Sequence, residues 1–130
     1  KFSFAIFDVD HFKTVNDTKG HLAGDQILRQ IADTIHARID RRHLFIRYGG
    51  DEFVLLGLHY DLEAMTTFCE RLRAILEERM GGVTLSFGIS TWHGGCDSLP
   101  GLIARADRAL YRSKEKGRNA VSDESEIDAA

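Results

Sequence analysis

Acidic residues occupy two places in the sequence where they could bind a divalent cation. Asp8 and Asp10 flank Val9 at the end of an apolar run, and Asp51 and Glu52 follow two glycines. Carboxylate oxygens suit Mg²⁺, which usually keeps substrate phosphates among its other ligands. Each segment alone is more typical of a solvated strand end or turn than of a metal site. A hard-cation site that takes a phosphorylated substrate forms only if the fold brings the two segments together.

Groups that could hold phosphate lie beside the first acidic segment and in a basic segment near residue 116. The backbone N–H groups of residues 11–13, where the chain turns toward a helix, can bind phosphate oxygens. Lys114 and Arg118 lie four residues apart, a spacing that projects both side chains from one side of a helix. The basic residues there could instead serve only to complement the dipole at a helix C-terminus. The spacing alone favours this second interpretation.

Other catalytic chemistries lack their usual motifs in this sequence. The histidines show no spacing typical of zinc ligands, and no Gly-x-Ser-x-Gly segment or Cys/His pair indicates a nucleophile. Cys69 and Cys96 are too few for a disulfide framework. They fit a reducing compartment, so we expect a cytoplasmic domain.

The composition restricts the class of protein and of partner. The chain has 130 residues, which fits one domain. It holds 17 Lys and Arg against 20 Asp and Glu, and residues 122–130 contain four of the acidic ones. The remaining body is almost neutral and lacks the basic excess of a duplex-DNA or RNA binder. No apolar run approaches the ~20 residues that a spanning helix needs. We expect no nucleic-acid partner and no membrane contact from this segment.

Strands and helices alternate along the chain in a way that predicts the fold class. Apolar runs and alternation predict strands over 2–9, 44–48, 53–58 and 83–92, with a short edge strand at 120–121. Helical spacing predicts helices over 22–39, 61–80 and 102–116, and residues 11–20 read as a loop or short helix. The order favours an α+β fold on the βαββαβ, ferredoxin-like plan, with a mostly antiparallel sheet and helices packed on it.

Several segments together resemble one known family. Residues 47–53 read Arg-Tyr-Gly-Gly-Asp-Glu-Phe and contain the signature of the GGDEF diguanylate cyclases. The other matching segments are 8–13, Asn16-Asp17, Gly20-His21, Gly24-Asp25, 86–90, 106–111, Lys114 and 117–119. The resemblance covers about residues 2–121 and implies a palm-type, nucleotidyl cyclase-like catalytic domain over 1–121. Residues 122–130 are expected to form an acidic, solvated tail.

The resemblance implies a reaction in which two GTP molecules become cyclic di-GMP and two pyrophosphates. Each subunit would hold one GTP, so a second GGDEF subunit would face the first in a homodimer. Two Mg²⁺ or Mn²⁺ ions per half-site would be held by Asp8, the Val9 carbonyl and Asp51. Asp51 or Glu52 would accept the proton of the attacking 3′-hydroxyl.

The remaining site residues implied by the resemblance bind the nucleotide. Lys13 would stabilise charge in the transition state, and Lys114 and Arg118 would hold the terminal phosphates. The other members of the set are His11 and Phe12, through their backbone N–H groups, and Asn16, Asp25 and His21, around the guanine. A carboxylate such as that of Asp25 can accept from the N1–H and N2–H₂ donors of guanine, a pair that adenine lacks.

The sequence departs from the family pattern in two respects. Many members carry an Arg-x-x-Asp motif just before the signature that binds the product as an inhibitor. Asp40 and His43 stand at those arginine and aspartate positions here, so we expect this inhibition site to be lost. The family domain also usually begins with a further helix before the first strand. We therefore expect a piece of a longer protein, with a sensory or dimerising domain upstream.

Two other functions compete with catalysis of this reaction. A non-catalytic GTP-binding regulatory domain would share the fold, although such relatives usually lose signature residues. A palm-type cyclase or polymerase-like domain for another nucleotide would share the metal-binding carboxylates, and Asp25 argues against it. A purely structural module leaves the acidic segments unexplained.

Overall fold

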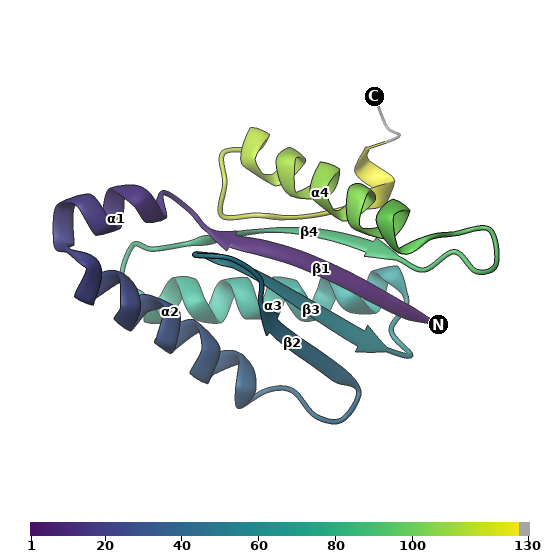
Figure 1. The fold of residues 1–130 in the computed structure, drawn as a ribbon, viewed down its shortest axis with the longest axis horizontal. Helices are drawn as coiled ribbons and strands as arrows, with labels where there is room; N and C mark the ends of the chain where they lie inside the picture. The colour runs from purple at the N-terminus through teal and green to yellow at the C-terminus, as the bar shows by residue number, and fades with distance from the viewer. Residues whose placement is uncertain (128–130) are drawn as a thin grey trace.

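The computed structural model describes residues 1–127, which form one sheet and its covering helices (Figure 1). The elements, in chain order, are β1 (Phe2–Val9), α1 (Phe12–Lys19), α2 (His21–His36), β2 (His43–Arg47), β3 (Glu52–Leu58), α3 (Leu62–Arg79), β4 (Leu85–Thr91), α4 (Leu99–Glu115), β5 (Val121–Asp123) and the 3₁₀ turn η1 (Glu124–Glu126). The five-stranded sheet has the order β2-β3-β1-β4-β5. Only the β4–β5 pair is parallel, so the predicted α+β class and mostly antiparallel sheet are confirmed.

Strand β1 lies in the middle of the sheet and sends alternate side chains to two separate cores. Phe7 lies on the face covered by α2 and α3, and its ring stacks on Phe87 with centroids 4.5 Å apart and on Phe53 at 5.5 Å. Phe4 and Ile6 point to the opposite face, where α4 packs. Apart from Ser3 and Asp8, this strand is apolar because both of its faces are buried.

Helices α2 and α3 cover one face of the sheet through the apolar positions that the periodicity predicts. Their buried residues include Leu28, Ile31 and Ile35 of α2 and Met65, Cys69, Leu72 and Leu76 of α3. Asp61 caps α3 as expected, because its side chain accepts a hydrogen bond from the Ala64 N–H at 2.8 Å. The structure also separates α2 from the polar segment before it, which was predicted as a loop or short helix. Residues 12–19 form the separate helix α1, and Gly20, with φ of 89°, breaks the chain between the two helices.

Helix α4 covers the other face and approaches the sheet very closely. It begins at Leu99, three residues before the predicted start, because Ser98 caps it and Pro100 is tolerated in the first turn. A side chain at Gly88 of β4 would place its Cβ only 2.1 Å from the Ala106 carbonyl oxygen. This glycine therefore lets α4 lie directly on β4.

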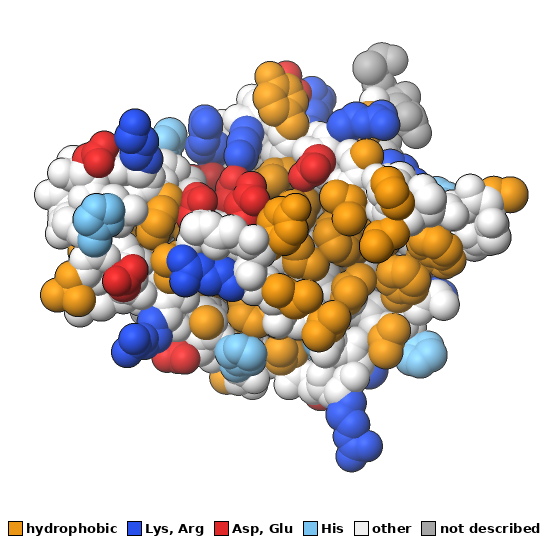
Figure 2. All heavy atoms as spheres, viewed as in Figure 1, with side chains coloured by type: hydrophobic (Ala, Val, Ile, Leu, Met, Phe, Trp, Pro, Cys, Tyr) orange, Lys and Arg blue, Asp and Glu red, His pale blue; other side chains and the backbone are white. Residues whose placement is uncertain are grey.

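The same face is left open over β2 and β3. Leu44, Ile46 and Leu58 are each about half exposed. Figure 2 shows the resulting apolar area as a broad group of hydrophobic side chains beside the region of α4. Helix α4 covers only that half of the face which β1 and β4 form.

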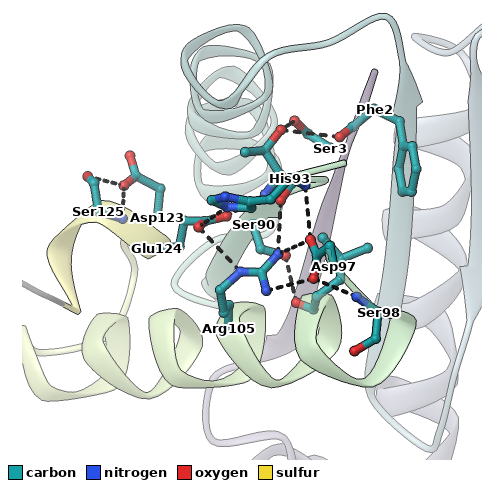
Figure 3. A network of polar contacts seen from close by, with 12 residues as sticks. Phe2, Ser3, Ser90, His93, Asp97, Ser98, Arg105, Asp123, Glu124 and Ser125 are labelled. Carbon is teal, nitrogen blue, oxygen red and sulfur yellow. Dashed lines mark hydrogen bonds and ion pairs between the residues drawn. The ribbon is translucent and has the colours of Figure 1, made fainter. Parts of the chain in front are cut away.

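The expectation of a solvated tail is wrong for the described part of residues 122–130. Ser122 is fully buried in β5, and the Glu124 carboxylate accepts from the Thr91 N–H at 2.6 Å. Figure 3 shows the Glu124 side chain between His93 and Arg105, in contact with both. Composition alone could not reveal these long-range partners. Asp128 and the residues after it lie outside the described part of the chain.

We predict that Glu124→Ala destabilises the fold by removing the acceptor shared by these three groups. The partly buried Thr91 N–H loses its partner, so the free energy of unfolding should fall by about 1–3 kcal/mol. Urea denaturation measures the change. Glu115→Ala is the matched control, because Glu115 forms a solvent-exposed pair with Arg112 at 3.8 Å. That variant should change stability by less than about 0.5 kcal/mol. Equal losses for both variants would contradict a structural role for Glu124.

Candidate active site

The end of β1 and the signature turn meet, as the metal-site hypothesis requires. The Val9 N–H donates to the Asp51 carbonyl at 3.3 Å, and Asp8 lies directly opposite Glu52 in the β1–β3 ladder. Residues opposite each other in a ladder project from the same face. A cleft of about 260 Å³ opens here, and its lining consists of Asp8, Val9, Asp10, His11, Phe12, Lys13, Asp51, Lys114 and Arg118. Figure 2 shows acidic side chains gathered in this region with Lys and Arg side chains next to them.

The signature turn is braced by a residue whose role the sequence did not reveal. The Arg47 guanidinium donates to the Gly50 carbonyl at 2.6 Å and to the Gly49 carbonyl at 3.2 Å. The Tyr48 N–H closes the turn by donating to the Glu52 carbonyl at 2.8 Å. Arg47 thereby holds the backbone that carries Asp51. Its position directly before the turn was the only available sign of this role.

Asp8 is a buried carboxylate with an incomplete set of partners. Its Oδ2 accepts from the Lys114 Nζ at 2.8 Å, whereas its buried Oδ1 has no hydrogen-bond partner among the described residues. Burial raises the pKa of Asp8 above its ordinary value, the hydrogen bond from Lys114 opposes this, and the nearby charges of Asp51 and Asp10 add to the rise. This carboxylate would therefore gain from a further positive charge.

The carboxylate oxygens of the cleft can supply some, but not all, of the ligands of a hard divalent cation. The unpartnered Oδ1 of Asp8 and the carboxylate of Asp51 belong to the same cleft. Within residues 1–127, no three His, Cys, Asp or Glu side chains lie close enough to form a complete site. The protein would supply only some ligands, and water or phosphate oxygens would supply the rest, as is usual for Mg²⁺.

The beginning of α1 provides a phosphate-binding arrangement on the same cleft. His11 adopts a left-handed conformation, with φ of 56° and ψ of 35°, and no side chain from the described residues caps the helix. A non-glycine residue in this conformation costs of the order of 1 kcal/mol or more, and such strain is concentrated at functional sites. The uncapped N-terminus exposes N–H donors and the positive end of the helix dipole to an anion.

Lys114 and Arg118 also reach this cleft, from α4 and from the turn that follows it. The ion pair between Lys114 and Asp8 shows that this lysine serves the cleft rather than the carbonyls of its own helix. The alternative reading of Lys114, as a simple complement to the helix dipole, is therefore not favoured.

The residues expected to bind guanine lie farther from the cleft. Asn16 packs on α2 so closely that a Cβ at Gly24 would lie 2.0 Å from its Oδ1, and this buried oxygen has no hydrogen-bond partner within residues 1–127. His21 and Asp25 are exposed on α2. Neither lines the cleft, and Asp25 instead borders a hollow of about 460 Å³ shared with Arg47. The structure brings the phosphate and metal groups together but leaves these two residues apart from them.

Comparison with known proteins identifies the family. The family model described as "Diguanylate cyclase, GGDEF domain" matches residues 1–120. The chain belongs to the GGDEF domain family. The fold agrees, because the GGDEF domain of DgcB from Caulobacter crescentus, solved in complex with c-di-GMP, superposes with a TM-score of 0.89 at 33% identity. That match covers 95% of this chain and 78% of the other.

Curated relatives of this GGDEF domain carry the name diguanylate cyclase. Diguanylate cyclase VdcA of Vibrio cholerae is 40% identical over 129 residues, covering 92% of this chain and 38% of the relative. Diguanylate cyclase A of Treponema denticola is 36% identical over 127 residues, covering 92% of this chain and 34% of the relative. The chain thus spans little more than a third of the length of these relatives. Among residues 1–127, no helix combines the length and apolar character needed to cross a membrane.

We predict that Asp8→Asn stabilises the metal-free GGDEF domain at neutral pH. A carboxyl whose pKa is raised by folding contributes stability at low pH that is lost as the pH rises through the folded-state pKa. Removing the charge therefore removes a cost, and Lys114, which is partly exposed, can be hydrated instead. Thermal melts at pH 7 measure the effect, with Asp33→Asn on the exposed side of α2 as the control for charge.

The same melts test the metal site. Magnesium at a hundred times its dissociation constant should stabilise the wild-type domain by about 2.7 kcal/mol. The Asp8→Asn variant should lose this gain, whereas Asp33→Asn should keep it. A variant that melts below the wild type without metal, or that gains as much from magnesium, would contradict the assignment.

Proposed function

We propose that this GGDEF domain is a diguanylate cyclase that condenses two GTP molecules into cyclic di-GMP and two pyrophosphates. The observation that carries the proposal is the cleft at the end of β1. Its lining combines two carboxylates, Asp8 and Asp51, with the cations of Lys13, Lys114 and Arg118 and the N-terminus of α1. Such a site can bind a nucleoside triphosphate together with divalent cations. The names of the relatives add support.

In the proposed site, Asp8, the Val9 carbonyl and Asp51 hold the divalent cations, which we take to be two Mg²⁺ or Mn²⁺ ions per half-site. When bound, these ions lower the pKa of the 3′-hydroxyl and offset the charge that develops on the phosphates. The buried, unpartnered Oδ1 of Asp8 is the feature of this chain that supports the assignment.

The chain's own groups bind the triphosphate and hold its charge. His11 and Phe12 offer backbone N–H groups at the start of α1, and Lys13 follows them on the first turn. Lys114 and Arg118 bind the terminal phosphates. Lys114 is paired with Asp8 in the free domain, so it exchanges that partner for a phosphate oxygen when the nucleotide binds. Asp51 or Glu52 accepts the proton of the attacking hydroxyl.

Guanine is selected on the α1–α2 side of the domain in this proposal. Asn16 and Asp25 bind the base, with His21 beside them. A carboxylate accepts from both N1–H and N2–H₂ of guanine, whereas adenine presents an acceptor at N1 and no 2-amino group. The buried Oδ1 of Asn16, which has no partner among residues 1–127, supports its use by a ligand.

The reaction joins two GTP molecules, and in this proposal it uses two copies of the domain. The 3′-oxygen of each GTP attacks the α-phosphate of the other, which forms an ester bond and releases pyrophosphate. Each copy holds one GTP, so the half-sites face each other in a homodimer. We place the reaction in the cytoplasm, in agreement with the unpaired Cys69 and Cys96. An upstream sensory or dimerising domain would bring the copies together.

We also infer that product inhibition through the Arg-x-x-Asp position is absent. Asp40 is engaged within its own turn, where it pairs with the Arg42 guanidinium at 2.9 Å. The side chain of His43 is almost fully buried, its Nε2 lies 2.9 Å from the Tyr60 hydroxyl, and its ring stacks on Phe68. Asp40 therefore stabilises the turn before β2, and His43 packs the start of β2 against Tyr60 and α3.

We predict that Asp51→Asn abolishes cyclase activity in a dimeric form of the protein. The loss of a metal-binding and proton-accepting carboxylate should lower kcat by a factor of about 10² to 10⁴. Formation of cyclic di-GMP from GTP and Mg²⁺ is followed by chromatography, with Asp33→Asn as the control. Binding of GTP without turnover in the wild-type dimer would support a regulatory domain instead. Equal turnover of ATP would support a less selective cyclase.

We predict that Gly24→Ala weakens GTP binding by displacing Asn16. The added Cβ would lie 2.0 Å from the Asn16 Oδ1 and 3.1 Å from the Phe12 ring, so the asparagine must move. Loss of one base contact should raise KM for GTP by about tenfold, equivalent to about 1.4 kcal/mol. Gly95→Ala is the matched control, because a Cβ there meets no atom within 4 Å. An unchanged KM in the Gly24 variant would count against Asn16 as a base-binding residue.

A further inference from the structure

Asp10 is a second buried carboxylate at the end of β1, and its surroundings differ from those of Asp8. It is only 6% exposed. Its Oδ1 accepts from the Ser86 hydroxyl at 2.6 Å, and its Oδ2 accepts from the Thr84 hydroxyl at 2.7 Å. The same Oδ2 also accepts from the Asn119 backbone N–H at 3.0 Å. Both oxygens are therefore occupied by protein donors, and Asp10 is poorly suited to bind a metal ion.

The partners of Asp10 join three parts of the chain that are far apart in sequence. Thr84 directly precedes β4, Ser86 lies near its start, and Asn119 belongs to the turn after α4. The Asp10 N–H also donates to the Thr84 carbonyl at 2.9 Å. A buried carboxylate without a cationic partner is costly unless several hydrogen bonds satisfy it. Its cost is offset here only when all these segments are in place.

The turn that Asp10 holds carries one of the residues proposed to bind the triphosphate. Arg118 and Asn119 adopt consecutive left-handed conformations, with φ of 67° and 48°. Non-glycine residues in this region persist only where the surrounding structure holds them. The Arg118 N–H donates to the Ser113 carbonyl at 3.0 Å, and the Asn119 N–H donates to Asp10. The strained turn is thus fixed on both sides of Arg118.

The side chain of Asn119 ties the same turn to α3. Its Oδ1 accepts from the Arg73 guanidinium at 2.8 Å, and its Nδ2 donates to the Glu77 carboxylate at 2.6 Å. Arg118 itself is exposed and borders the cleft. Its reach toward the cleft is therefore set by the backbone of the turn rather than by contacts of its own side chain with the core.

We propose that Asp10 is a positioning residue that presents Arg118 to the terminal phosphates of the substrate. Asp10 binds no substrate atom and acts through the Asn119 N–H, which fixes the left-handed turn before the nucleotide arrives. The inference rests on the proposed function, because it takes a nucleoside triphosphate as the ligand of the cleft. It assigns to Asp10 a role distinct from metal binding by Asp8, two residues earlier on the same strand.

The test uses Asp10→Ala, which removes both acceptor oxygens. An asparagine at this position can keep its amide oxygen on the Asn119 N–H and the Thr84 hydroxyl and donate its NH₂ group to the Ser86 hydroxyl, so Asp10→Asn would preserve the contact. Asp10→Ala cannot preserve it. Binding of GTPαS with Mg²⁺, measured by calorimetry, should weaken by about tenfold, in the range usual for residues that orient a ligand-binding group. Thr84→Val is the matched control, because it removes a different hydrogen bond to Asp10 and should change affinity by less than about twofold.

A double-mutant cycle separates positioning from a general loss of structure. Arg118→Ala alone should weaken GTPαS binding. In that background, the further change Asp10→Ala should weaken it by less than about twofold, because the group that Asp10 positions is gone. Effects that simply multiply in the double variant would overturn the proposal. This binding assay does not depend on turnover, so a wild-type domain that binds GTPαS but makes no cyclic di-GMP would refute the proposed function and leave the role of Asp10 testable.

Hydrogen exchange of the wild-type domain provides a test that no folding defect can confuse. The Asn119 amide should already be protected in the nucleotide-free protein, and addition of GTPαS should change its protection by less than about twofold. Rapid exchange that is slowed only by the nucleotide would show that the turn forms on binding. That result would overturn the assignment of Asp10 as the residue that fixes it beforehand.

Discussion

The central position of β1 determines where the site of this domain forms. Because β1 pairs with β3 on one side and β4 on the other, its polar end is flanked by the signature turn and by the start of β4. The chain then enters α1 directly, and α4 lies on the strand's outer face. Carboxylates, a helix N-terminus and lysine or arginine side chains meet there because they all adjoin one strand end.

Two buried carboxylates at this strand end have different hydrogen-bond partners. Asp10 receives neutral hydrogen bonds on both oxygens, so it can remain buried as a structural anion. Asp8 has one cationic partner and one oxygen without a partner, and burial raises its pKa. The burial of Asp8 is left partly uncompensated, whereas hydrogen bonds offset the burial of Asp10. This division is typical of sites in which one group must stay available to a ligand while its neighbours hold the frame.

Local patterns in the sequence predict most helices and strands. The features that they do not predict depend largely on contacts between residues far apart in the sequence. Periodicity identified α2 and α3 because their apolar faces repeat at helical spacing. Glu124 was expected in solvent, since nothing near it in sequence indicates its contacts with Thr91 and Arg105. Helix α4 begins earlier than the apolar periodicity predicts, because its first turn is defined by the Ser98 cap and by Pro100, which do not belong to the apolar repeat. Motifs located the cleft residues, but not the brace from Arg47 or the anchor between Asp10 and Asn119.

The contacts that complete the cleft have a consequence for the synthesis of the protein. Lys114 pairs with Asp8 across 106 residues of sequence, and Asn119 bonds Asp10 across 109. A ribosome therefore exposes the acidic strand end long before it exposes the residues that neutralise and anchor it. During translation β1 can pair with β3 and β4 first, but Asp8 and Asp10 lack these two partners until the segments around Lys114 and Asn119 have left the exit tunnel. A partly made chain therefore cannot complete this cleft until the turn after α4 has left the exit tunnel.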